Sequence, residues 1–147
     1  MSVLISGPPD AIRGSKVDVA KLHRRARRIL EAIGEADSEL SIALVDDPEI
    51  RELNASWRGH ERATDVLSFS QIEGGFADHR GSLLGDVVIS VETAAVQAAE
   101  RHRALDDEVT RLLIHGVLHL IGHDHQLDSE AEAMKLEERR IWRVVTE

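Results

Sequence analysis

Three histidines in the C-terminal half of the chain have the spacing of a metal site. His115 and His119 are four residues apart, which places them on one face of a helix, one turn apart. Gly122 allows the helix to end, because glycine accepts the left-handed conformation that often follows helix C-termini. The chain can then bring His125 to the same point. Three imidazoles with one open coordination position are typical of a catalytic zinc ion, so the sequence predicts a metal site with these three ligands.

The helix that carries the first two histidines is apolar on nearly every side. Its apolar residues are Leu112, Leu113, Ile114, Val117, Leu118, Leu120 and Ile121. This pattern predicts a buried helix, in which an unpaired polar group costs about 1–3 kcal/mol. A single histidine in such a helix is usually a hydrogen-bonded core residue, whereas three histidines at this spacing favour a shared metal ion.

The same spacing resembles the zinc-binding helix of the metzincin proteases, His-Glu-x-x-His-x-x-Gly-x-x-His. In those enzymes the glutamate after the first histidine is the general base. The corresponding residue in this chain is Gly116, which has no side chain to transfer a proton. The sequence therefore favours a metal-assisted hydrolysis other than peptide cleavage.

Four ordered blocks of sequence resemble one family more specifically. They are Leu53-Asn54-x-x-Trp57-Arg58-Gly59, Thr64-Asp65-Val66-Leu67-Ser68-Phe69, Leu84-Gly85-Asp86-Val87-Val88-Ile89-Ser90 and His115-Gly116-x-Leu118-His119-Leu120-x-Gly122-x-Asp124-His125. Together they resemble the YbeY endoribonucleases, also called rRNA maturation factors. The chain departs from the family at His123, where tyrosine is usual, and at Trp57, where another aromatic residue is common. The family pattern and the metzincin-like spacing both select His125 as the third ligand.

The resemblance implies a zinc-dependent endoribonuclease that cleaves single-stranded RNA and holds one Zn²⁺ per chain. Its substrate would be ribosomal RNA, including the 3′ end of small-subunit rRNA. Its role would extend to ribosome assembly or quality control, with ribosomal particles or ribosome-associated proteins as further partners. Either a metal-activated hydroxide or the RNA's own 2′-hydroxyl would attack the phosphate. Two alternatives stay open, namely a metalloprotease with its base elsewhere in the chain and a non-enzymatic ribosome-assembly factor with structural zinc.

Arg58 is the main candidate for a catalytic residue beside the metal. It lies at the end of a predicted short helix, just before Gly59, and the resemblance implies a functional role for it. A guanidinium is permanently charged and can hold a phosphate with two parallel hydrogen bonds. It can also stabilise the charge that develops in a transition state. The alternative is an ordinary surface arginine.

Five other positions have more than one interpretation. Asp86 lies in an apolar strand, where a carboxylate is rarely buried unpaired, and Asp124 precedes His125. Each aspartate either accepts a hydrogen bond from a ligand imidazole, as carboxylates near metal sites often do, or pairs with another group. Trp57 is either a core residue, which is the commoner case, or a platform for base stacking. Thr64-Asp65 is a helix cap, a turn or part of the site, and turn chemistry alone can explain the pair.

The composition predicts one ordinary globular domain over residues 1–147. The chain is 42% hydrophobic and 31% charged, as is usual for soluble proteins. It contains no cysteine, which excludes disulfides and thiolate metal sites. No apolar stretch approaches the roughly 20 residues needed to span a bilayer, and the N-terminus lacks the features of a signal peptide. We therefore expect a cytoplasmic enzyme.

The net charge of −9 is the main argument against an RNA substrate, because phosphate binding normally depends on lysine and arginine. One segment is nevertheless basic. Lys21, Arg24, Arg25 and Arg28 fall on one face of a predicted amphipathic helix, opposite its apolar residues. This basic stripe is either a solvated helix face or a contact to the RNA backbone.

Periodicity and turn residues predict the element order β-α-β-α-β-β-α-α-α. The expected strands are Val3–Ser6, Leu40–Val45, Asp65–Ser70 and Leu83–Ser90, and the expected helices are Asp18–Ile33, Asp47–Trp57, Val91–His102, Asp107–Ile121 and Ser129–Val144. Residues Glu73–Gly81 are expected to form a loop. This order favours an α+β fold with a small mixed β-sheet of about four strands, helices packed on it and the metal-binding helix at the centre.

Overall fold

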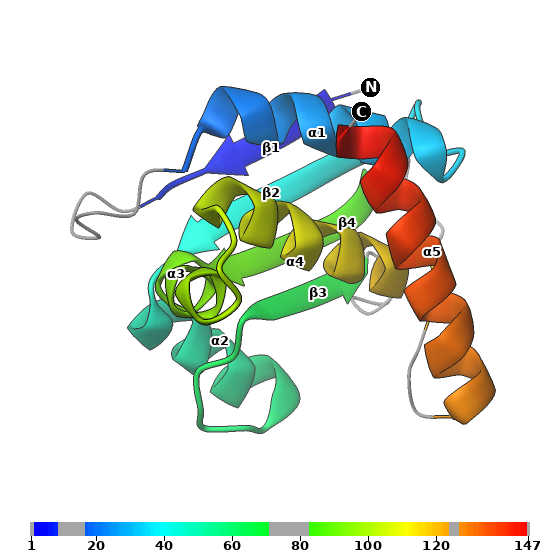
Figure 1. Cartoon of the computed structure of the whole chain (residues 1–147). Coiled ribbons are helices and arrows are strands. Elements are labelled where there is room, and N and C mark those ends of the chain that lie inside the picture. The colour runs from blue at the N-terminus through cyan, green and yellow to red at the C-terminus, as the bar shows by residue number, and fades with distance from the viewer. Residues whose placement is uncertain (1, 9–16, 71–82, 124–126, 147) are drawn as a thin grey trace.

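The computed structural model describes residues 2–8, 17–70, 83–123 and 127–146 (Figure 1). Its elements are β1 (Ser2–Ser6), α1 (Val19–Ala32), β2 (Glu39–Val45), α2 (Asp47–Arg58), β3 (Val66–Ser70), β4 (Leu83–Ser90), α3 (Val91–Glu100), α4 (Leu105–Leu120) and α5 (Asp128–Thr146). The predicted α+β class and element order are confirmed, and the predicted bounds differ from these by at most two residues. The predicted loop Glu73–Gly81 lies outside the described residues.

The four strands form one mixed sheet in the order β1-β2-β4-β3. β1, β2 and β4 are parallel to one another, whereas β3 runs antiparallel to β4 at the edge. The sequence of β4 is nearly continuously apolar, a pattern typical of a buried strand. Val87 and Ile89 are indeed buried, but Asp86 is exposed. The two faces of β4 are therefore covered to different extents.

The helices cover the two faces of the sheet unequally (Figure 1). α1, α4 and α5 form a layer on one face, and the main core lies between this layer and the strands. Buried members of this core include Leu22, Ile29, Ile42, Val87, Leu113 and Met134. On the other face, Ile50 of α2 packs on Leu67 and Val88 in a smaller cluster. Part of this second face remains uncovered beside α2.

Gly116 allows α4 to lie unusually close to the sheet. A Cβ atom at this position would come within 2.8 Å of Val87 Cγ1 and 3.1 Å of Ser68 Oγ. The Ser68 hydroxyl donates a hydrogen bond of 2.9 Å to the Gly116 carbonyl. The close approach fixes α4 against β3 and β4, and it places the histidines on either side of Gly116 in the chain beside the edge strand.

The helix α4 ends as the sequence predicts. Gly122 has a left-handed φ of 102°, and its N–H donates to the His119 carbonyl at 3.1 Å. The N–H of His123 donates to the Leu118 carbonyl at 3.0 Å. This pair of bonds is a Schellman motif, which satisfies carbonyls that the helix itself leaves without partners.

The structure corrects the predicted basic stripe at one member. The Arg25 guanidinium forms a 2.9 Å ion pair with Asp107 and donates to the Thr110 hydroxyl at 2.9 Å. Arg25 is therefore held against α4, because α1 turns this position toward the helix layer. Arg24 and Arg28 are exposed, and their contact with RNA stays a prediction. Among the described helices, none combines the length and apolar character needed to cross a membrane.

Candidate metal centre

His115 and His119 project from the same side of α4 and face each other. Their Nε2 atoms are 3.1 Å apart, and their ring centroids are 4.7 Å apart. Two nitrogen ligands of a tetrahedral zinc ion, with bonds of about 2.0–2.1 Å, would be about 3.3 Å apart. The two imidazoles thus fit the ligand spacing of a zinc site with little rearrangement.

Glu138 of α5 holds the first of these imidazoles. Its Oε1 lies 2.9 Å from His115 Nδ1, and both side chains are about one third exposed, at 33% and 35%. An ionised carboxylate can only accept a hydrogen bond, so Nδ1 carries the proton. In the neutral imidazole Nε2 of His115 then carries the lone pair, the form in which this atom can bind a metal ion, and carboxylates beside metal ligands commonly impose this arrangement.

Two predicted residues cannot be placed relative to this pair. His125, the predicted third ligand, and Asp124 both lie outside the described residues. Within residues 2–8, 17–70, 83–123 and 127–146, no group of three histidine, cysteine, aspartate or glutamate residues could hold a metal ion. The ligand role of His125 and the hydrogen-bonding role of Asp124 therefore stay predictions.

The structure brings Arg58 to the same pocket as the two histidines. The pocket has a volume of about 560 Å³, and its walls include Arg58, Ser68, Ser70, His115 and His119. Arg58 is the last residue of α2, which ends at Gly59 with a left-handed φ of 72°. The guanidinium donates to the Ser68 carbonyl, and its carbon lies 4.7 Å from the centre of the Phe69 ring. These contacts hold a permanent positive charge beside the imidazoles.

Asp65 lines the metal pocket, and both of its carboxylate oxygens accept hydrogen bonds. Its Oδ1 accepts from the Val66 N–H at 2.8 Å, and its Oδ2 accepts from Gln97 at 3.2 Å. These bonds join the start of β3 to α3. The carboxylate thus stabilises the wall of the pocket.

Two other candidates lie elsewhere than the sequence indicates. Asp86 lines a second pocket on the opposite face of the sheet together with Trp57, so the structure does not bring it to His115 or His119. Trp57 is 68% exposed, and its interpretation as a core residue is wrong. α2 packs on the sheet through Ile50 and Leu53, which leaves Trp57, near the end of the helix, outside the small core.

The position of Gly116 argues against the protease alternative. Metzincins carry their general base at this position, but here the position points into the packed contact with Val87 and Ser68. A glutamate side chain would collide with the sheet. The helix α4 therefore lacks the glutamate that acts as the protease base, and the packing at position 116 leaves no space for one.

The fold and the site define an α+β protein with a candidate histidine metal centre and an arginine in the same pocket. The chain belongs to the Endoribonuclease YbeY family, whose model matches residues 11–146. It is 48% identical over 123 residues to Endoribonuclease YbeY of Anaeromyxobacter sp. (strain Fw109-5), which covers 84% of this chain and 62% of that relative. It is 42% identical over 128 residues to Endoribonuclease YbeY of Geobacter sulfurreducens, which covers 86% of this chain and 85% of that relative.

A solved structure has the same fold. The solution structure of TM1509 from Thermotoga maritima superposes with a TM-score of 0.63 at 28% sequence identity, and the match covers 97% of this chain and 88% of that chain. The agreement extends over nearly the whole length of both chains. It therefore supports the arrangement of the sheet and the helix layer around the candidate site.

Replacing Glu138 with glutamine should weaken zinc binding by roughly 10- to 100-fold, as the loss of a carboxylate partner of a ligand imidazole commonly does. The amide is neutral, and it no longer favours the His115 tautomer with the proton on Nδ1. A competition titration with a coloured chelator measures the affinity. Glu137→Gln is the matched control, because Glu137 lies on the same helix but pairs with Arg140. Equal zinc affinity in both variants would show that Glu138 does not orient the ligand.

Proposed function

We propose that this protein is a zinc-dependent endoribonuclease that cleaves single-stranded ribosomal RNA during rRNA maturation, including the 3′ end of small-subunit rRNA. One observation carries the proposal: two imidazoles with Nε2 atoms 3.1 Å apart share a pocket with Arg58. Membership of the Endoribonuclease YbeY family, and the activity in the names of its relatives, support RNA as the substrate.

The residues at the site fit a zinc ion. His115 and His119 would bind it through Nε2, and His125 is the proposed third ligand. Imidazole nitrogens are common zinc ligands, and three of them leave one position open for water or substrate. Such an ion acts as a Lewis acid toward a phosphoryl oxygen and lowers the pKa of a coordinated water to about 7.

Arg58 has the position and chemistry to bind the scissile phosphate. Its hydrogen bond to the Ser68 carbonyl and its contact with the Phe69 ring hold the guanidinium at the edge of the pocket. From there it can donate to phosphate oxygens and oppose the negative charge that increases in the transition state. Glu138 contributes by keeping the His115 ring in one orientation.

The acidic character of the chain is consistent with a ribosomal partner. A net charge of −9 disfavours tight binding to naked RNA, whose affinity for proteins depends mainly on basic residues. We propose that ribosomal particles or ribosome-associated proteins supply the missing affinity. In this setting the protein would also act in ribosome assembly or quality control.

The proposal is tested with one labelled RNA presented alone and annealed to its complement, together with a peptide substrate. Zinc-loaded protein should cleave the single strand at least about tenfold faster than the duplex, because duplex pairing prevents bases from being splayed out. It should leave the peptide intact. A 2′,3′-cyclic phosphate at the new end identifies attack by the RNA 2′-hydroxyl. Peptide cleavage would instead favour the protease, and fully zinc-loaded protein without nuclease activity would favour the assembly factor.

A further inference from the structure

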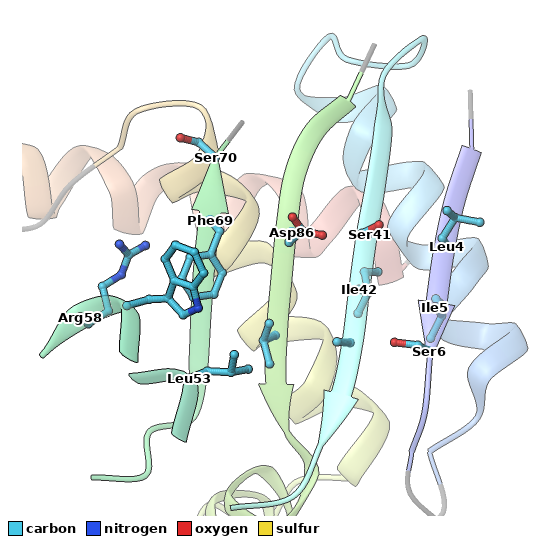
Figure 2. A pocket seen from close by; sticks show the side chains of 13 residues that line it. Leu4, Ile5, Ser6, Ser41, Ile42, Leu53, Arg58, Phe69, Ser70 and Asp86 are labelled. Atoms are coloured by element: carbon cyan, nitrogen blue, oxygen red, sulfur yellow. The ribbon is translucent and has the colours of Figure 1, made fainter. Parts of the chain in front are cut away.

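A second and larger pocket lies on the sheet face opposite the metal centre (Figure 2). Its volume is about 830 Å³, within the usual size of ligand pockets. The strand registers align Phe69 with Asp86, Asp86 with Ser41, and Ser41 with Leu4. These four residues form a row across all four strands, on the part of the face that α2 leaves uncovered.

One end of this pocket is an aromatic platform. The Trp57 and Phe69 rings have centroids 6.1 Å apart and planes inclined by 68°. Trp57 is 68% exposed, although a tryptophan in a protein without a partner is usually largely buried. Phe69 is partly buried beneath it. Proteins that bind single-stranded nucleic acids use an exposed aromatic ring beside an arginine in this way, as a surface on which a base stacks.

Asp86 supplies a hydrogen-bond acceptor beside the platform. Figure 2 shows its side chain projecting from β4 into the pocket. Partial burial raises the pKa of its carboxyl group, and the carboxylate has no hydrogen bond or ion pair within the described part of the chain. A carboxylate repels phosphate, so it would accept a hydrogen bond from an RNA strand either from a ribose 2′-hydroxyl or from an N–H at the edge of a base. Beside an aromatic ring on which a base can stack, the base edge is the donor within reach.

The two pockets lie on either side of the edge strand β3 and share part of their walls. Arg58 and Ser70 line both of them. An RNA strand with a phosphate at Arg58 can therefore have its next base on the other side of β3, against Trp57. A peptide fits less well, because the floor of this pocket is a sheet face whose backbone groups already pair, and peptides commonly add to an open strand edge.

We propose that the second pocket binds the nucleobase next to the scissile phosphate, stacked on the Trp57 ring beside Phe69, with its Watson–Crick edge donating to Asp86. This inference rests on the proposed function and extends it to the base sequence at the cleavage site. Guanine presents two adjacent donors, N1–H and the N2 amino group, to one carboxylate. Uracil presents a single N–H between two carbonyl groups. The carboxylate repels these carbonyl oxygens. The pocket should therefore prefer guanine and disfavour uracil.

Binding can be measured without metal or catalysis. The chain has two tryptophans, so the variant Trp142→Phe reports on Trp57 alone. Short single-stranded RNAs that differ at one base should quench its fluorescence, because a stacked base contacts the indole. We expect the guanine-containing RNA to bind about tenfold more tightly than the uracil-containing one, as one bidentate base contact typically provides.

Two substitutions in the Trp142→Phe background separate base recognition from charge. Asp86→Asn should remove the preference for guanine over uracil, because an amide both donates and accepts and so matches uracil. Asp37→Asn, in the exposed turn before β2, is the matched charge control and should keep the preference. Asp86→Asn should fold, because it removes a charge that partial burial disfavours, and urea unfolding checks this.

The contribution of base stacking on Trp57 is measured separately. Trp57→Ala should weaken binding of all these RNAs by roughly tenfold, as the loss of one base-stacking ring does, and fluorescence anisotropy of labelled RNA measures the affinity.

Unchanged base preference in Asp86→Asn, or unchanged affinity in Trp57→Ala, would overturn the base subsite and favour a polypeptide as the occupant of this face. If the parent protein cleaves RNA while showing no base preference, the subsite fails and the proposed function stands. If it shows the preference but zinc-loaded protein does not cleave, the proposed function fails alone.

Discussion

Replacing His119 with alanine is expected to remove bound zinc and to lower RNA cleavage by more than about a hundredfold, because the chemistry of a catalytic metal ion is lost with it. The variant loses one of two imidazoles whose Nε2 atoms are 3.1 Å apart. Its folding should be little affected, because His119 is only partly buried and lies in the last turn of α4. Elemental analysis and a cleavage assay on the same sample measure both effects.

His123→Tyr is the matched control for this variant. The described interaction of His123 is made by its backbone N–H, which caps α4, and a tyrosine keeps that N–H. Zinc content and cleavage should therefore remain close to those of the parent protein. If His123→Tyr loses the metal while His119→Ala retains it, the ligand assignment is wrong.

Replacing Arg58 with alanine should lower RNA cleavage by about 100- to 1000-fold while leaving zinc content unchanged, as the loss of one charge-stabilising donor at a transition state does. Arg58 also has a structural role that its sequence position did not indicate. The substitution removes the hydrogen bond to the Ser68 carbonyl and the contact with the Phe69 ring. We therefore expect the free energy of unfolding to fall by about 1 kcal/mol.

Arg51→Ala provides the matched control, because Arg51 is exposed on the same helix and lies outside the metal pocket. It should retain nearly full cleavage. Arg58→Lys retains the positive charge but cannot form a two-pronged contact with a phosphate, so its activity should lie between those of the parent and Arg58→Ala. A folded, zinc-loaded Arg58→Ala protein with unchanged cleavage would remove Arg58 from the catalytic site.

The features that depend on local sequence could be predicted well. A spacing of four residues was enough to place His115 and His119 together on α4, since helix geometry alone determines which residues share a face. Gly122 was enough to predict the end of that helix, because few other residues adopt its left-handed conformation. The order and bounds of the elements follow in the same way from apolar periodicity and capping residues.

The features that depend on packing between distant elements could not be predicted. Glu138 contacts His115 across 23 residues of sequence, and nothing in the pattern of α5 distinguishes it from the neighbouring glutamates. Asp86 occurs in an apolar strand, so its exposure became apparent only from the incomplete cover of the second sheet face by α2. The same incomplete cover explains why Trp57 is exposed. Arg25 occupies a basic helix face in the sequence but pairs with Asp107 of α4.

We propose that zinc at the histidine pair enables this chain to cleave single-stranded RNA. The most direct test is to add zinc in steps to metal-depleted protein and to follow cleavage of the labelled single-stranded RNA. Cleavage should rise with added zinc and level off at about one ion per chain, while His119→Ala should stay inactive throughout. Full cleavage by metal-depleted protein, or no cleavage at one bound zinc per chain, would contradict the claim.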